Sequence, residues 1–240
     1  MKKEKDKIKC TEEQINTIFT RKYLTISNEI EEIIDQIIVN EKGKNLILDR
    51  ITRRAQMRES DLQIIDGLIY QKIVEKNDSE IQKKLKEKLP NGIINLEKCS
   101  DINYQELQNL LINKNFEEAD KLTQEYLRDI VKLKTNSSKN WLYFTDIQFI
   151  PKKDLFILDL LWKIYSKGKF GYSIQKKIWI KNNKKWDHLW KKIYWTKHGV
   201  MKRYPNEFTW TIDAPEGHLP LFNQLRGTQT LLYLFLSIDW

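Results

Sequence analysis

Apolar residues recur at helical spacing along most of the chain. In the first third, a run of isoleucines steps by three, one, three and one residues, which places these side chains on one stripe of an amphipathic helix. The stripe consists of Ile30, Ile33, Ile34, Ile37 and Ile38. Three more helices are expected at about residues 46–58, 60–76 and 78–89. Because the next residues, Pro90-Asn-Gly92, are a strong turn signal, residues 1–90 are predicted to form an N-terminal helical bundle.

The helical pattern resumes after this turn and continues through the rest of the sequence. Two apolar stripes, at residues 104–111 and 116–130, are separated by a short polar stretch that is typical of a helix–helix turn. Four later helices are expected: one that begins at Pro151, one that Ser173 caps, one over Trp186–Tyr194 and one over about residues 221–237. With only 8 glycines and 5 prolines in 240 residues, the pattern predicts an all-α protein, in which the chain after Pro90-Asn-Gly92 forms a second domain.

Two connections in the second domain lack helical spacing. The shorter one is a turn built on Gly168 and Gly171, and it carries Phe170 and Tyr172. The longer one, residues 198–210, is rich in aromatic side chains. Long segments without regular structure are uncommon in compact domains unless they are functional, so the longer connection is a candidate functional segment.

Positive charge and tryptophan are both concentrated in the second domain. The net charge is +9, yet residues 167–203 alone carry twelve Lys and Arg against one acid, Asp187. All eight tryptophans lie between Trp141 and Trp240. The basic segment has three interpretations: a solvated face of a lysine-rich chain, a field that steers an anionic ligand or a protein partner, or a surface for single-stranded nucleic acid.

Common enzyme and metal-site patterns are absent. The sequence has no phosphate-binding loop, no nucleophile elbow, no HExxH motif and no dinucleotide fingerprint. The three histidines (His188, His198 and His218) are dispersed, and the two cysteines do not form a CxxC pair. No apolar run reaches the length of a membrane span, and the first residues resemble neither a secretory signal nor a transit peptide. We therefore expect no catalytic residues, no metal ligands and a protein that acts in the compartment where it is made.

The turn at Gly168 and the segment near Gly217 carry a specific resemblance. The matching residues are Leu161-Trp162, Phe170-Gly-Tyr-Ser-Ile-Gln175, Trp179, Trp195, Ala214-Pro215, Gly217-His-Leu-Pro220 and Leu225-Arg-Gly227. In this combination the sequence strongly resembles the genomes-uncoupled-four family, from about Leu96 onward. The resemblance implies that the second domain covers residues 96–240 and is the tetrapyrrole-binding domain. Members of that family are porphyrin-binding proteins that stimulate magnesium chelatase in chlorophyll synthesis. The resemblance implies a helical core shaped like a cupped hand, preceded in some members by a helical domain.

The resemblance also implies a ligand site between two loops. The family's ligands are protoporphyrin IX and Mg-protoporphyrin IX. By position, the apolar floor of the site would be Phe144, Ile147, Phe170 and Ile174. The second loop would contribute Met201, Tyr204, Phe208 and Trp210, and Arg226 would bind a porphyrin propionate. The sequence departs from the family pattern at Met201 and Tyr204, where relatives often have Trp, and at Gln229, where relatives often have a second Arg.

The residues support such a ligand on physical grounds as well. A porphyrin is an apolar plate with anionic propionates, and each aromatic side chain offers about 150–250 Å² of surface. At roughly 25 cal/mol per Å², partial cover by three or four such groups is enough for a micromolar complex at about −8 kcal/mol after ordering costs. Without a ligand, Trp162, Trp179, Trp190 and Trp195 are explained as core by helical spacing alone, and Arg226 would only brace a helix.

The hypothesis from the sequence is therefore a non-catalytic tetrapyrrole-binding regulator. Its expected partner is the large porphyrin-binding subunit of magnesium chelatase, with peripheral membrane association that depends on ligand or partner. The expected location is the plastid stroma, with a plastid-encoded gene, and a cyanobacterial cytoplasm is the second choice. Two other classes stay open: a basic, aromatic-rich module that binds single-stranded nucleic acid, and an enzyme that acts on tetrapyrroles.

Overall fold

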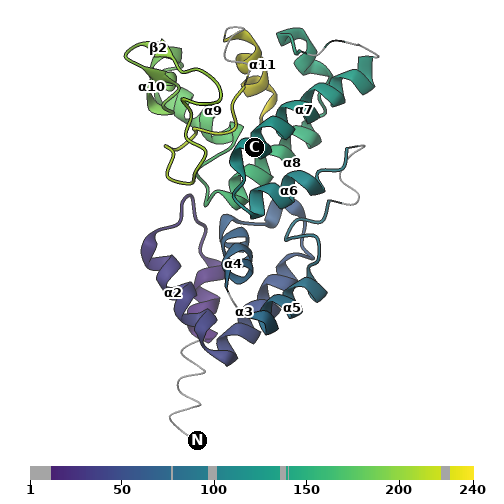
Figure 1. Cartoon of the computed structure of the whole chain (residues 1–240), viewed down its shortest axis with the longest axis vertical. Helices are drawn as coiled ribbons and strands as arrows, with labels where there is room; N and C mark the ends of the chain where they lie inside the picture. Colours follow the sequence, from purple (N-terminus) through teal and green to yellow (C-terminus); the bar gives the residue numbers. More distant parts are fainter. Residues whose placement is uncertain (1–11, 77, 97–101, 136–138, 140, 223–227) are drawn as a thin grey trace, which may run out of the picture. The chain divides into compact units, whose positions relative to one another are not determined.

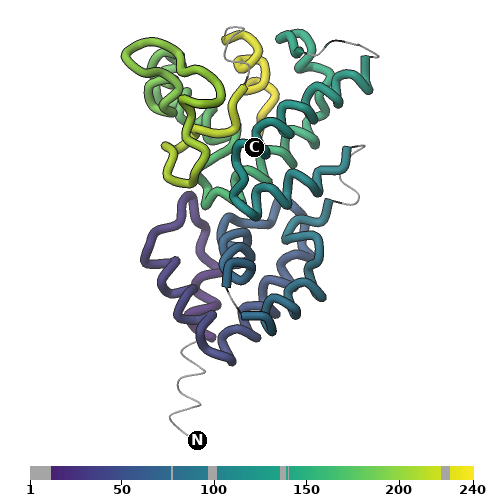
Figure 2. Tube along the Cα trace, in the orientation of Figure 1, coloured from purple at the N-terminus to yellow at the C-terminus, as the bar shows by residue number. Residues whose placement is uncertain are grey.

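The computed structural model describes residues 12–76, 78–96, 102–135, 139, 141–222 and 228–240. The chain divides into two compact units, Met1–Asn95 and Leu96–Trp240 (Figures 1 and 2). None of the helices in the described ranges combines the length and the apolar character needed to cross a membrane.

The N-terminal unit is a bundle of helices. It contains helical residues 12–20, α2 (Asn28–Val39), α3 (Glu41–Arg54), the 3-10 turn η1 (Glu59–Asp61), α4 (Ile64–Glu75) and α5 (Ser79–Lys88). The isoleucine stripe predicted from the sequence lies on α2, where Ile34, Ile37 and Ile38 are buried. The central helix is α4, which is buried along most of its length. Its fully buried Asp66 pairs with Arg54 of α3, so the carboxylate has a charged partner inside the bundle.

The C-terminal unit is also helical. It contains α6 (Gln105–Ile112), α7 (Phe116–Thr135), the 3-10 turn η2 (Phe144–Phe149), α8 (Lys152–Tyr165), α9 (Tyr172–Lys181), α10 (Trp186–Lys192), β1 (Thr196–Lys197), β2 (Val200–Met201) and α11 (Gln229–Ser237). The two short strands pair antiparallel, with Thr196 opposite Met201. The predicted all-α fold class is confirmed, with this hairpin as a small addition.

The core of the C-terminal unit is organised around α8. Trp162 is fully buried, and its indole N–H donates to the Thr123 hydroxyl of α7 at 3.0 Å. On the side facing α6, the Tyr165 hydroxyl donates to the Gln108 side chain at 2.8 Å. Specific hydrogen bonds therefore join α8 to two neighbouring helices, α7 and α6.

Two local predictions from the sequence were wrong. Ser173 does not cap α9, because the helix already begins at Tyr172 and the Ser173 hydroxyl has no partner within the described ranges. Asp159 of α8 acts instead, and its Oδ1 accepts the Ser173 backbone N–H at 2.8 Å. The last helix was predicted to begin at residue 221, but Leu221 is in an irregular segment and α11 begins at Gln229.

Candidate functional site

The long connection between β2 and α11 is fixed by His218, which is completely buried. Its Nε2 accepts the Thr209 backbone N–H at 3.1 Å, so Nδ1 carries the proton and donates to the Ile193 carbonyl at 2.6 Å. The indole N–H of Trp195 donates to the His218 carbonyl at 2.8 Å. Burial lowers the His218 pKa to about 4, so the ring is neutral at pH 7. His218 therefore joins the loop to the end of α10.

The same connection is also held against α7. Asp120 is buried, and its Oδ1 accepts the Leu221 backbone N–H at 2.6 Å. Gln124, one turn later, donates to the Leu221 carbonyl. Burial raises the Asp120 pKa to about 8, because an ionised carboxylate would lose its water there. Both backbone groups of Leu221 are therefore bound by side chains of one helix, α7.

Three of the four loop residues predicted to bind porphyrin form one aromatic cluster, which we call the loop cluster: Tyr204, Phe208 and Trp210. The Trp210 ring lies 5.9 Å from Tyr204 and 6.2 Å from Phe208, measured between centroids. Phe208 is buried against His218, whereas Tyr204 is 47% exposed. The fourth residue, Met201, lies half-buried in β2. The loop cluster thus exposes the Tyr204 ring to solvent, while its Phe208 ring is buried against His218.

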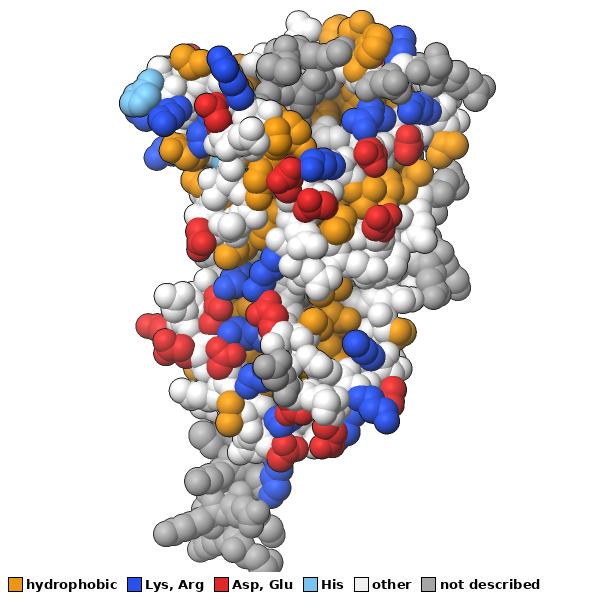
Figure 3. All heavy atoms as spheres, viewed as in Figure 1, with side chains coloured by type: hydrophobic (Ala, Val, Ile, Leu, Met, Phe, Trp, Pro, Cys, Tyr) orange, Lys and Arg blue, Asp and Glu red, His pale blue; other side chains and the backbone are white. Residues whose placement is uncertain are grey.

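Phe144 and Ile147 lie apart from the loop cluster in sequence, on η2. The Phe144 ring is half-buried and contacts Tyr233 of α11 with centroids 5.2 Å apart. Ile147 is buried, and η2 packs against both α7 and α11. Beside them, Tyr143 is 45% exposed and Tyr233 43% exposed. On the face that Figure 3 shows, hydrophobic side chains lie interspersed with Lys, Arg, Asp and Glu.

Phe170 and Ile174 belong to the packed interior. Phe170 has no exposed surface and contacts the rings of Phe116 and Trp162. Ile174 is 6% exposed. A ligand would reach Phe170 only if this packing opened, so its predicted role in the porphyrin floor stays a prediction. The predicted propionate partner, Arg226, lies outside the described residues.

Four tryptophans form a column beside the loop. Successive centroids are 5.0 Å (Trp179 to Trp186), 5.3 Å (Trp186 to Trp190) and 5.2 Å (Trp190 to Trp195) apart. Phe235 of α11 contacts the first two rings. Trp195 and Trp179 are buried, as expected of core residues, while Trp186 and Trp190 are half-buried. The column joins α9, α10 and α11 and accounts for part of the tryptophan concentration without a ligand.

The basic segment is only partly a solvated face. Lys169 donates to the Ile212 carbonyl and Lys176 to the Ile238 carbonyl. Lys202 is buried with its ammonium 3.2 Å from the centroid of the Tyr194 ring. Its pKa is lowered, chiefly by burial. Lys167 is half-buried, and the other eight positive residues are exposed: Lys177, Lys181, Lys184, Lys185, Lys191, Lys192, Lys197 and Arg203.

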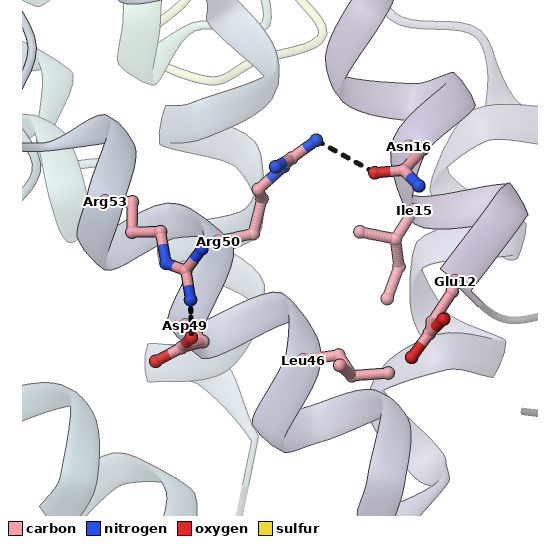
Figure 4. A pocket seen from close by; sticks show the side chains of 7 residues that line it. All are labelled: Glu12, Ile15, Asn16, Leu46, Asp49, Arg50 and Arg53. Atoms are coloured by element: carbon pink, nitrogen blue, oxygen red, sulfur yellow. Dashed lines mark hydrogen bonds and ion pairs between the residues drawn. The ribbon is translucent and has the colours of Figure 1, made fainter.

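A pocket of about 190 Å³ lies in the N-terminal unit (Figure 4). Ile15 and Leu46 line its apolar part, and Arg50 reaches toward Asn16, to which it donates at 2.9 Å. Pockets that bury drug-sized ligands measure about 300–1,000 Å³, so this one is too small for a tetrapyrrole. No group of three or more His, Cys, Asp or Glu suited to a metal ion occurs in the part of the chain that the structure describes.

Sequence reasoning assigned no role to Asp120, Gln124 or Asp159. A signal was present for Asp120, because an acidic residue stood on the apolar stripe of α7, between Ala119 and Thr123. No local signal identified Gln124, because its partner Leu221 is 97 residues away.

Comparisons with known proteins agree on one family. Residues 97–237 match the family model described as GUN4-like. "Uncharacterized protein ycf53" of Porphyra purpurea is 47% identical over 176 residues, which is 73% of this chain and 74% of the relative. "Tetrapyrrole-binding protein, chloroplastic" of Arabidopsis thaliana is 37% identical over 134 residues, covering 52% of this chain and 50% of that protein. The solved "Structure of GUN4 from Chlamydomonas reinhardtii" matches with a TM-score of 0.53 and 40% identity, over 60% of this chain and 93% of that one.

Proposed function

Because this chain belongs to the GUN4-like family, we propose that it binds a tetrapyrrole through its C-terminal unit. The observation that carries the proposal is the loop cluster: an exposed Tyr204 ring packs edge-on against Trp210 on a segment fixed by His218. An apolar plate gains free energy on such a surface at roughly 25 cal/mol per Å² buried. A base held in place beforehand reduces the ordering cost of binding.

The proposed ligands are protoporphyrin IX and its magnesium complex. Tyr204 and Trp210 would cover part of the ring, together with Phe144 of η2. Arg226, five residues after the anchored Leu221, would bind a propionate, since a guanidinium can hold a carboxylate through two parallel hydrogen bonds. The named relative from Arabidopsis, a tetrapyrrole-binding protein, supports this ligand class.

The proposed cellular role is regulatory rather than catalytic. The protein would deliver porphyrin to the large subunit of magnesium chelatase, or carry its product away, and so stimulate the chelatase. The plastid is the proposed location, which the chloroplastic relative supports. A peripheral membrane association that depends on ligand or partner is part of the same proposal.

The test is a titration of tryptophan fluorescence with deuteroporphyrin IX, a soluble porphyrin, and with its magnesium complex. Saturable quenching at micromolar concentration is expected, and Arg226→Ala should weaken it about tenfold. The matched control is Arg53→Ala in the N-terminal unit, because Arg53 pairs with Asp49 and both side chains are exposed. A folded protein without saturable quenching would refute porphyrin binding.

Two further arms address the role and the rival class. Added to purified chelatase subunits, the protein should raise the rate of magnesium insertion, and an unchanged rate would refute the regulatory role. A labelled single-stranded oligonucleotide at two salt concentrations tests the basic segment. Saturable, strongly salt-dependent binding would favour the nucleic-acid function instead.

A further inference from the structure

Arg128 is a half-buried arginine in the middle of α7. No hydrogen bond, ion pair or ring contact engages its guanidinium within the described ranges. A guanidinium has five N–H donors in a planar fork and remains charged at all physiological pH values. Arg128 therefore holds an unused set of donors on α7.

Arg128 follows, on the same helix, the two residues that hold the loop. Asp120, Gln124 and Arg128 are spaced by four residues, so they follow one another along one edge of α7. The first two bind the backbone of Leu221. Arg128 comes one turn later, about 6 Å further along the helix axis. The same edge begins near Tyr204, whose raised pKa, due mainly to burial, also reflects the charges of Asp120 and Lys121.

Two other cations of α7 already have acidic partners. Lys121 forms an ion pair with Glu117 at 2.7 Å, and Lys132 forms one with Asp129 at 3.6 Å. Arg128 differs from both because no ion pair engages its guanidinium among the described residues. A charge that is partly withdrawn from water gains most from a partner that brings the opposite charge.

We propose that Arg128 binds a carboxylate of the tetrapyrrole and is thus a ligand-binding residue supplied by α7. The inference rests on the proposed function, since it concerns the orientation of the same ligand. The ring would lie against aromatic surface of the loop cluster, and one of its propionates would extend over α7 to the guanidinium. The planar guanidinium of arginine matches the geometry of a carboxylate better than the ammonium of lysine does. Lysine at position 128 should therefore restore only part of the binding.

The experiment compares deuteroporphyrin IX with its dimethyl ester, which has the same ring and no negative charge. Dissociation constants are measured for the wild type, Arg128→Gln and Arg128→Lys. The control variant is Lys132→Gln, which removes the same charge one turn later, where Lys132 faces Asp129 at 3.6 Å. Circular dichroism and thermal unfolding establish that each variant is folded.

Arg128→Gln should bind the free acid about tenfold more weakly and the ester unchanged. The affinity of Arg128→Lys for the free acid should lie between the affinities of the wild type and of Arg128→Gln. The affinity of Lys132→Gln should stay within about twofold of that of the wild type. Equal losses for acid and ester, or equal effects of Arg128→Gln and Lys132→Gln, would overturn the role of Arg128. If the folded wild type binds neither compound, the proposed function itself fails; if the wild type binds and Arg128→Gln binds equally well, only the present inference fails.

Discussion

The carboxyl group of Asp120 accepts the backbone N–H of Leu221 at 2.6 Å, although the two residues are 101 positions apart. Gln124, on the next turn of α7, donates to the carbonyl of the same Leu221. A buried stretch of irregular backbone needs partners for its N–H and C=O groups, and here two side chains supply them. This is the physical reason why Leu221 is not the first residue of a helix, contrary to the prediction from the sequence.

The buried Asp120 should make stability depend on pH. Burial raises its pKa to about 8, so the folded protein keeps a proton on Asp120 that the unfolded chain releases near pH 4. The stabilisation is complete below pH 4 and is lost as the pH rises toward 8. Between pH 6.5 and 8, the free energy of unfolding of the wild type should fall relative to that of Asp120→Asn, by up to about 1.4 kcal/mol per pH unit. Urea denaturation at several pH values measures this difference, and parallel curves would contradict it.

The buried His218 should lower the free energy of unfolding as the pH falls. Burial lowers its pKa from 6.5 to about 4, so the unfolded chain takes up a proton that the folded protein refuses. Stability contributed by the neutral ring is present above pH 6.5 and is lost as the pH falls to 4. Relative to His218→Gln, the wild type should lose up to about 3 kcal/mol across this range. The same denaturation series measures it, and equal slopes for the two proteins would show that His218 titrates normally.

Gly171 should not tolerate a side chain. Its φ is +130°, and a Cβ there would lie 2.8 Å from Asp159 Oδ1, the oxygen that binds the Ser173 N–H. Gly171→Ala should therefore destabilise the protein by about 3 kcal/mol, through strained backbone and the displaced carboxylate. Gly199→Ala is the matched control, since φ is +80° there but nothing lies within 4 Å of the added Cβ. Its cost should be about 1 kcal/mol, measured by denaturation; equal losses would argue against the Asp159 contact.

Substitution of a surface aromatic residue should weaken porphyrin binding, whereas substitution of a core aromatic residue should lower stability. Tyr204→Ala should weaken porphyrin binding severalfold and change the free energy of unfolding by less than about 1 kcal/mol, because the ring is 47% exposed. Phe170→Ala should cost about 3–5 kcal/mol of stability, because the ring is completely buried against Phe116 and Trp162. Fluorescence titration and urea denaturation of the same samples provide both values. A stable Phe170→Ala protein that no longer binds porphyrin would instead place Phe170 in the ligand site.

The periodic spacing of apolar residues determined the helices and the class of fold. A helix is formed by contacts three and four residues apart, so the isoleucines of α2 and the apolar stripes at residues 104–111 and 116–130 could be recognised locally. The motifs around Gly168 and Gly217 were likewise sufficient to indicate the family. The aromatic character of residues 198–210 also marked the loop cluster before its geometry was known.

The tertiary structure decided what depends on residues far apart in the chain. It showed that Asp159 rather than Ser173 caps α9, and that Phe170 is interior whereas Tyr204 is at the surface. It showed that Asp120 and Gln124 hold Leu221, and that Arg128 follows them on the same edge of α7 without a partner in the described ranges. Spacing along the sequence records which residues share a face of a helix. Burial and hydrogen-bond partners depend instead on the elements packed against that face, which only the folded chain brings together.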